Sequence, residues 1–582
     1  MDSSDRMIEV KNGLGSFRAR FQACTEKQTA PATAPSEHGV LKCLGISYGQ
    51  IPRRWAAPRP ALTPWKGTQD LTDFGPACPQ VHEPLFAVPG LPVFGPPSET
   101  SISILARSED EYRCLNLNVF APVRLGDEER LEQPPIPLPV LVWVHGGAFR
   151  AGCGGTDLYD GSPLVARSVD FGHPVIVVTL NYRLGVLGFV HSQKLLEDAA
   201  KQEDVPEHCR STANLALLDI SMAFSWIKHN ISCFGGDPSN VTGFGESAGS
   251  ALLNYMALTP SLYPNIPRML YSSSTIFSVQ LLQGKESQQW MDAICAKNDI
   301  PPDSGDSVDR LRRLDIHTLV QSSHFACSSF RPILDGVTIP SDPRSAIFGD
   351  ARWDPALKEV IFGHCENEAW LKLAYRQGVP PPLESNIAGR MPPVQDLRGR
   401  AQNLYNAAMD SRYSWYQSPI PSTLSPGGLA WMALDGHARY YVPGQLLGTS
   451  FAKGSEHAVA YRYIFKWTPM QWPENWPATH TADLLPMFLH KSLGAEDMLA
   501  ARSFADQIVL FASGGSAKAN CLQIYAETTG WLSNVFERDG RWTTTKKGEE
   551  EFGLSSEAVA LWEDVFRVCL DWEQSGWEGM IR

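Results

Sequence analysis

The sequence predicts an α/β fold in which a large, mostly parallel central sheet is flanked by helices. Two short apolar runs rich in β-branched residues, "PVLVWV" (139–144) and "PVIVVTLNY" (174–182), are typical of strands buried on both faces. A helical pattern follows them between residues 214 and 234. Because strands alternate with helices along the chain, we expect helices on both faces of the sheet.

The later segments continue this alternation. Within residues 214–234, four residues recur at spacings of three and four: Leu215, Leu218, Met222 and Trp226. Three further runs repeat the strand pattern: "SNVTGFG" (239–245), "KEVIFGH" (358–364) and "AVAYRYIF" (458–465). A helix is expected after the first of them, in "ALLNYMAL" (251–258). Catalytic groups in such sheets lie at the carboxyl ends of the strands.

Composition and charge indicate a soluble globular protein and argue against some classes of partner. The chain has 582 residues, a formal net charge of -13 and 43% hydrophobic residues, as a soluble globular protein does. The negative charge argues against nucleic acid or an anionic membrane surface as the main partner. No apolar run approaches the roughly 18 residues that a membrane helix needs. The N-terminus contains no apolar stretch typical of a signal peptide, so a cytoplasmic protein is expected, with its oligomeric state left open.

Two further expectations concern the N-terminal segment and the cysteines. Residues 1–38 are polar and rich in Pro and Ala towards their end, which predicts a flexible leader. The 12 cysteines show no C-x-x-C and no regular spacing, which indicates neither a zinc site nor a dense disulfide framework. No H-E-x-x-H or other cluster of metal ligands is present, so neither a metal nor a cofactor is predicted.

The stretch "VTGFGESAGS" (241–250) fits two glycine motifs. As G-x-G-x-x-A it would be the phosphate-binding turn of a dinucleotide site, and as G-x-S-x-G it would present Ser247 as a nucleophile. A dinucleotide site needs an acidic residue about 20 positions further on. No Asp or Glu occurs between Ser247 and Lys285, which favours the nucleophile. Gly245 and Gly249 then flank the serine, where larger side chains would collide with a tight turn.

Six separated segments occur in one order along the chain: "LNLNVFAP", "WVHGGAF", "NYRLGVLGF", "FGGDPSNVTGFGESAGS", "ENEA" and "ATHTADLLPMF". In this order they resemble the type-B carboxylesterases, the branch of the α/β-hydrolases that also holds the cholinesterases. The resemblance runs from about Gly45 to the C-terminus and is strongest between Cys78 and Gly249. It implies an α/β-hydrolase fold, with helical and loop insertions that form an active-site gorge, over a single domain at residues 39–582.

The resemblance also implies a catalytic triad. Ser247 takes the place of the nucleophile, and His480 in "ATHTADLLPMF" takes that of the base, although Pro477 stands where the family has a glycine. The acid is expected in "GHCENEA" (363–369), where the family spacing selects Glu368. Periodicity alone leaves Glu366 open, because residues two apart on a strand point to the same face.

The segment "HGGAF" (145–149) resembles the family's glycine-rich oxyanion loop. The resemblance implies backbone N–H donors at Gly147, Ala148 and Ala248, aimed at the charge that develops on the carbonyl oxygen. Ala148 replaces a common glycine, so the loop must place an L-residue at a suitable φ. Cys78 and Cys114 match a disulfide pair of secreted relatives, and in a reducing compartment they would remain adjacent thiols.

These residues imply hydrolysis of a small-molecule carboxylic ester through an acyl-enzyme, without a cofactor. The same triad could serve acyl transfer or the formation or opening of a lactone. A non-catalytic binding or adhesion role, known where relatives have lost the serine, is disfavoured by the intact triad. Three segments that are candidates for lining the gorge, 87–97, 324–330 and 413–420, are apolar and aromatic and predict a bulky hydrophobic substrate.

Overall fold

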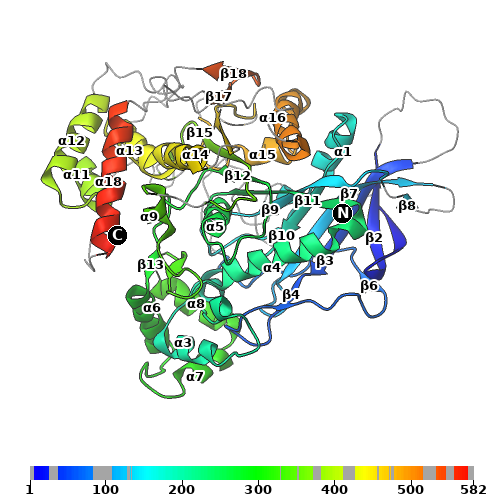
Figure 1. The fold of residues 1–582 in the computed structure, drawn as a ribbon, viewed down its shortest axis with the longest axis horizontal. Helices are drawn as coiled ribbons and strands as arrows, with labels where there is room; N and C mark the ends of the chain where they lie inside the picture. The colour runs from blue at the N-terminus through cyan, green and yellow to red at the C-terminus, as the bar shows by residue number, and fades with distance from the viewer. Residues whose placement is uncertain are drawn as a thin grey trace.

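The computed structural model describes most of the chain. The described residues are 5–24, 37–82, 108–126, 131–132, 134–327, 329–349, 353–370, 372, 382–409, 426–454, 458–470, 472, 477–514, 533–545 and 556–574. They form an α/β structure around one large sheet (Figure 1). Of the helices that these residues form, none combines the length and hydrophobicity needed to cross a bilayer.

The centre of the sheet is a run of parallel strands in the order β10-β9-β11-β12-β15-β16-β17. Their bounds are β9 (Leu138–Val144), β10 (Ile176–Leu180), β11 (Gly236–Glu246), β12 (Arg268–Ser272), β15 (Glu359–Cys365), β16 (Val459–Phe465) and β17 (Ser533–Phe536). All five strands predicted from apolar runs fall in this parallel centre. The predicted fold class is therefore confirmed.

Antiparallel strands extend the sheet at both edges. β7 (Asn116–Leu125) pairs with β10, β3 (Glu37–Ser47) pairs with β7, and β18 (Trp542–Thr545) pairs with β17. Two short strands pair alongside: β6 (Gln69–Asp70) with β2 (Gly15–Ala23), and β8 (Leu131–Glu132) with β7.

The prediction of a flexible leader over residues 1–38 is wrong for residues 5–23. β1 (Asp5–Asn12) and β2 (Gly15–Ala23) form an antiparallel hairpin, and β2 pairs with β3 at the edge of the sheet. Phe17, Ala19 and Phe21 are buried at alternate positions of β2. This period of two directs their side chains to one core and outweighs the polar composition of the segment. The Pro- and Ala-rich residues 25–36 lie outside the described residues.

Alternate side chains of each central strand enter two different cores. In β9, Val140, Val142 and Val144 belong to the larger hydrophobic cluster, whereas Leu141 and Trp143 belong to a second cluster. Successive side chains of a strand point to opposite faces of the sheet, so one short strand contributes to both cores. This explains why the run is apolar throughout instead of alternating.

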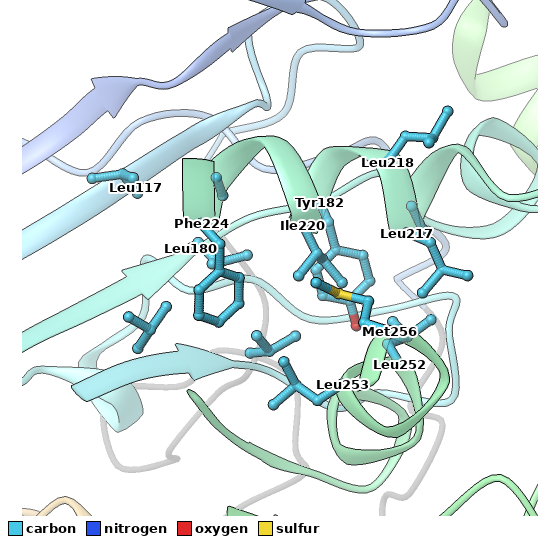
Figure 2. Close-up of a cluster of buried hydrophobic side chains, with 14 of the residues drawn as sticks. Leu117, Leu180, Tyr182, Leu217, Leu218, Ile220, Phe224, Leu252, Leu253 and Met256 are labelled. Carbon is cyan, nitrogen blue, oxygen red and sulfur yellow. The ribbon is translucent and has the colours of Figure 1, made fainter. Parts of the chain in front are cut away.

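Helices cover both faces of the sheet (Figure 1). α4 (Leu215–Asn230) and α5 (Ala248–Ala257) contribute to the larger cluster, and α1 (Ser162–Asp170) and α16 (Ala495–Gly514) to the second. Figure 2 shows side chains of α4 and α5 meeting near the strands, including Phe224, Leu253 and Met256, which have no exposed surface. Their burial holds α5 in place, and α5 begins directly after Ser247.

A separate group of helices lies at the side of the molecule away from β1 and β2 (Figure 1). It consists of α11 (Leu383–Arg390), α12 (Gln395–Met409), α13 (Pro426–Gly436), the π-helical turn η5 (His437–Tyr441), α14 (Val442–Gly454) and α18 (Ser556–Gln574). Most of these elements share a third hydrophobic cluster around Tyr405, Leu434 and Trp562. This helical group delivers one aromatic side chain, Tyr440, to the candidate site.

The other α-helices and strands of the described structure lie outside these groups. They are β4 (Gly49–Gln50), β5 (Arg59–Pro60), α2 (Gly185–Gly188), α3 (Gln193–Ala200), β13 (Leu282–Gln283), α6 (Gly284–Lys297), α7 (Ser307–Arg313), α8 (Ile316–Ala326), β14 (Ile333–Leu334), α9 (Pro343–Ile347) and α15 (Leu484–Met487).

Candidate active site

Ser247, His480 and Glu368 form one hydrogen-bonded chain. Nε2 of His480 lies 2.9 Å from Oγ of Ser247, and Nδ1 of His480 lies 2.6 Å from Oε2 of Glu368. Ser247 follows β11, Glu368 follows β15, and His480 lies on the loop after β16. All three therefore stand beyond the carboxyl ends of parallel strands, where the fold class predicts the site.

Ser247 sits on a sharp turn between β11 and α5. Its backbone has φ 53° and ψ -122°, and its N–H donates to the carbonyl of Ser272 at 3.0 Å. A Cβ added to Gly249 would overlap the carbonyl oxygen of Val144, and one added to Gly245 would lie 2.9 Å from the carbonyl carbon of Gly249. Both flanking glycines are thus required by close backbone approach, as the motif predicts.

The structure places Glu368, and not Glu366, against the histidine. Glu368 has no exposed surface, and its Oε1 accepts hydrogen bonds from Oγ of Ser273 at 2.6 Å and from N of Cys365 at 2.7 Å. Oε2 of Glu366 instead accepts from Arg538 at 3.1 Å. Because β15 ends at Cys365, the two-residue period of a strand does not extend to these glutamates.

The loop at Gly147 and Ala148 is shaped to expose backbone N–H groups. Gly147, Ala148 and Phe149 all have positive φ, of 109°, 53° and 63°. Among the described residues, neither Gly147 nor Ala148 has a hydrogen-bond acceptor for its N–H. The N–H of Ala248 belongs to the first turn of α5, whose donors lack helical partners. Ala148 adopts the left-handed conformation at a cost of roughly 1–2 kcal/mol.

Gly147→Ala should impair catalysis strongly. An added Cβ would overlap the carbonyl oxygen of Ala151, and the φ of 109° is unfavourable for an L-residue, so the loop must shift. Losing one oxyanion donor typically lowers kcat by about 10²–10³-fold, which we expect here. Gly305→Ala is the matched control, because its added Cβ meets nothing within 4 Å. Steady-state kinetics and melting curves of both variants test this, and unchanged kcat in Gly147→Ala would contradict it.

Comparison with known proteins agrees with this geometry. A model of the carboxylesterase family matches residues 31–562. The chain belongs to the carboxylesterase family. It is 29% identical over 480 residues to a para-nitrobenzyl esterase of Bacillus subtilis (strain 168), covering 81% of this chain and 84% of that protein. A solved structure of a PNB esterase superposes with a TM-score of 0.67 at 25% identity, covering 94% of this chain and 99% of the other.

The family also contains a relative described as inactive. The carboxylesterase-like protein VdtD of Byssochlamys spectabilis, named as inactive, is 30% identical over 329 residues, covering 53% of this chain and 50% of that protein. The present carboxylesterase matches the para-nitrobenzyl esterase over a much larger share of its length. Together with the family match and the structural match, this makes it a carboxylic ester hydrolase.

A second carboxylate of this carboxylesterase approaches the histidine. Oε1 of Glu246 lies 3.2 Å from Nε2 of His480, and Glu246 is buried. Burial raises the pKa of Glu246, and the neighbouring His480 lowers it in part. Burial lowers the pKa of His480, but the neighbouring Glu246 and Glu368 carboxyls outweigh it, so this pKa lies above its ordinary value.

We expect kcat/KM of the carboxylesterase to rise with pH through a midpoint above 6.5, the ordinary pKa of histidine. His480 must be neutral to take the serine proton, so a raised pKa delays activity to higher pH. Glu246→Gln removes one of the groups that raise this pKa and should move the midpoint to lower pH. Rate–pH profiles on one neutral ester compare the two proteins. A midpoint that stays or rises in the variant would show that Glu246 does not act on His480.

The loop that carries His480 is held to the sheet by Asp483. Its Oδ2 accepts hydrogen bonds from Oγ of Ser272 at 2.7 Å and from the hydroxyl of Tyr463 at 2.6 Å, and Asp483 is fully buried. The Tyr463 ring crosses β15 where Gly363 stands, and an added Cβ there would overlap the ring. The glycine that begins "GHCENEA" therefore leaves room for a residue that anchors the histidine loop.

Cys78 and Cys114 are buried and adjacent, as predicted. Both are free cysteines, the neighbouring Cys78 raises the pKa of the Cys114 thiol, and the N–H of Leu184 donates to Sγ of Cys78 at 3.2 Å. Whether the pair is bonded in the cell stays a prediction. Within the described part of the chain, no group of three or more His, Cys, Asp or Glu side chains could hold a metal ion.

Three residues of the site escaped the sequence analysis: Glu246, Ser273 and Tyr440. Glu246 directly precedes the nucleophile, so its position in the motif was an available signal. Tyr440 places its ring centroid 5.5 Å from that of His480. Neither Ser273 nor Tyr440 lies in a recognisable motif, and only the fold brings them to the triad.

Proposed function

We propose that this carboxylesterase works through an acyl-enzyme intermediate. His480 takes the proton of Ser247 as the serine oxygen attacks the ester carbonyl, and Glu368 orients the imidazole and stabilises its cation. The N–H groups of Gly147, Ala148 and Ala248 donate to the oxyanion. His480 then returns the proton to the leaving alcohol and activates water to release the acid. The 2.9 Å contact between Nε2 of His480 and Oγ of Ser247 carries this proposal.

The proposed substrate is a bulky, largely apolar ester. Three buried aromatic residues support it: Tyr440 beside His480, Phe149 at the end of the oxyanion loop, and Trp370 shortly after Glu368. Large apolar surroundings suit a substrate with a bulky apolar body. Of the three candidate lining segments, 87–97 and 413–420 lie outside the described residues. In 324–330, Phe330 packs against Trp290 in the core and Phe325 is 71% exposed, so this segment adds no support.

Pre-steady-state and steady-state kinetics would test the acyl-enzyme. With the 4-nitrobenzyl and 4-nitrophenyl esters of one acid, a common acyl-enzyme gives equal kcat whenever deacylation limits both reactions, and a burst of alcohol precedes the steady state. Added methanol distinguishes water from another acceptor, because a transferase forms methyl ester in preference to acid. An organophosphonate should label Ser247, and labelling of another residue in its place would refute the proposal.

Choline esters should gain no advantage from their charge. In cholinesterases, a tryptophan in the loop between the paired cysteines holds the quaternary ammonium by cation–π attraction. The segment from Cys78 to Cys114 contains no tryptophan in this chain. Comparing butyrylcholine with its neutral 3,3-dimethylbutyl analogue should give similar kcat/KM values. A strong preference for the cation would reveal another aromatic site for it.

A further inference from the structure

Three cationic side chains surround one buried carboxylate close to the triad. Asp435 at the end of α13 has no exposed surface, and its Oδ2 accepts a hydrogen bond from Nζ of Lys372 at 2.8 Å. Its Oδ1 is paired with Nη2 of Arg390 and lies 3.2 Å from Nε of Arg439. We refer to Lys372, Arg390 and Arg439 as the cationic cluster.

Tyr440 connects the cationic cluster to the triad. The Tyr440 ring centroid lies 5.5 Å from that of His480 and 5.4 Å from Nζ of Lys372. The same Nζ lies 3.3 Å from the Tyr440 hydroxyl. Tyr440 belongs to the π-helical turn η5, and such turns occur frequently at functional sites. A group bound at the cluster would therefore be separated from the catalytic histidine by the Tyr440 ring alone.

Among the described residues, the positive charge of the cluster exceeds the negative charge in contact with it. In the described structure, Asp435 is the one carboxylate within ion-pair distance of the three cations. Burial lowers the pKa of Lys372 to about 8. The positive charges of Arg439 and Arg390 also lower this pKa, whereas the Asp435 carboxylate raises it. Nε of Arg390 is buried without a hydrogen-bond acceptor, and Nε of Arg439 has only the ion-pair contact with Asp435 and no hydrogen bond. Unpaired buried donors and charges are costly unless a partner is supplied.

The cluster is also reachable from outside. The side chains of Lys372, Arg390 and Arg439 retain 33%, 18% and 40% of their surface exposed, whereas Asp435 retains none. The three cations thus keep a solvent-exposed side, in a chain whose formal net charge is -13. An anion that enters from that side would find both donors and charge.

We propose that the cationic cluster binds a carboxylate carried by the ester that Ser247 attacks. The inference rests on the proposed function and narrows its substrate to an amphipathic ester with a bulky apolar body and one acidic group. Guanidinium groups suit this role because their planar donors match the geometry of a carboxylate. The acidic group could belong to the acyl half or to the alcohol half of the ester.

Matched substrate pairs test the proposal and separate the two halves. The acyl arm compares 4-nitrophenyl hydrogen glutarate with its neutral methyl ester, and the alcohol arm compares 4-carboxyphenyl butyrate with 4-carbamoylphenyl butyrate. In one arm we expect kcat/KM to favour the anion by about tenfold or more at low salt. This preference should shrink as salt screens the charges. Preference for the neutral ester in both arms, or no preference, would overturn the proposal.

Lys372→Gln then links the preference to the cluster. Glutamine can still donate to Asp435, so the buried carboxylate keeps a partner while one positive charge is lost. The ratio of kcat/KM for the anionic and neutral esters should fall by about tenfold. Lys453→Gln, an exposed position in the last turn of α14, removes the same charge and should leave the ratio unchanged. An unchanged ratio in Lys372→Gln, even with both rates lowered, would show a structural role and refute the assignment.

A binding measurement keeps the proposal separate from the proposed function. If the protein hydrolyses none of the four esters, the proposed function fails. Calorimetric titration of the Ser247→Ala protein with butyl hydrogen glutarate still tests whether the cationic cluster binds a carboxylate. Binding that is at least about tenfold weaker in Ser247→Ala/Lys372→Gln would support the cluster, and equal binding would refute it. Hydrolysis of the neutral esters without any charge preference would refute the cluster alone.

Discussion

Ser247→Ala is expected to abolish ester hydrolysis while leaving the fold intact, with kcat lowered by about 10⁶-fold, as when a serine protease loses its nucleophile. Among the described residues, the hydroxyl removed has one side-chain hydrogen-bond partner, Nε2 of His480. The turn itself is held by the backbone bond from Ser247 to Ser272 and by the glycines on either side, all of which remain. Loss of activity with an unchanged melting temperature is thus the expected pair of results.

A matched serine strengthens this test. Ser239 lies on β11, the same strand that leads into the turn, but it is exposed and its hydroxyl donates to Asp237. Ser239→Ala should keep wild-type activity and remain open to phosphonate labelling at Ser247. Wild-type turnover in Ser247→Ala would refute the assignment of the nucleophile. Equal loss in both variants would point to damage of the strand instead.

Glu368→Gln is expected to lower kcat by about 10⁴-fold, the loss seen when the triad acid of a serine protease becomes its amide. Oε2 of Glu368 accepts from Nδ1 of His480, whereas an amide can present N–H there and favour the wrong tautomer. Ser273 and the N–H of Cys365 hold the other oxygen, so the side chain should stay in place. Apparent substrate affinity should therefore change much less than turnover.

Glu366→Gln is the control that this segment offers. Its carboxylate faces Arg538 and not the histidine, so turnover should fall by less than about tenfold. Both variants are measured on one neutral ester, with melting curves as a check on folding. If Glu366→Gln were the variant with the large loss of turnover, the orientation of the two glutamates described above would be wrong.

The chain sequence by itself determined the parallel centre of the sheet and the nucleophile turn. Strands such as β9 are buried on both faces, so their apolar runs are visible without knowledge of any partner strand. The glycines around Ser247 are required by close backbone contacts within the turn and with the adjacent strand. The hairpin at residues 5–23 was missed because a short alternation in a polar segment becomes a strand only when a sheet edge is present to pair with it.

Only the tertiary structure decided which glutamate meets His480, because β15 ends at Cys365, before both glutamates, and the backbone then turns. Only the tertiary structure, likewise, brings Ser273, Glu246, Tyr440 and the cationic cluster to the site. Their contacts join residues from different strands and from the helical group, and no local pattern records which distant side chain fills a given space. Local periodicity describes how a segment is buried, whereas the chemistry of this site depends on which segments meet.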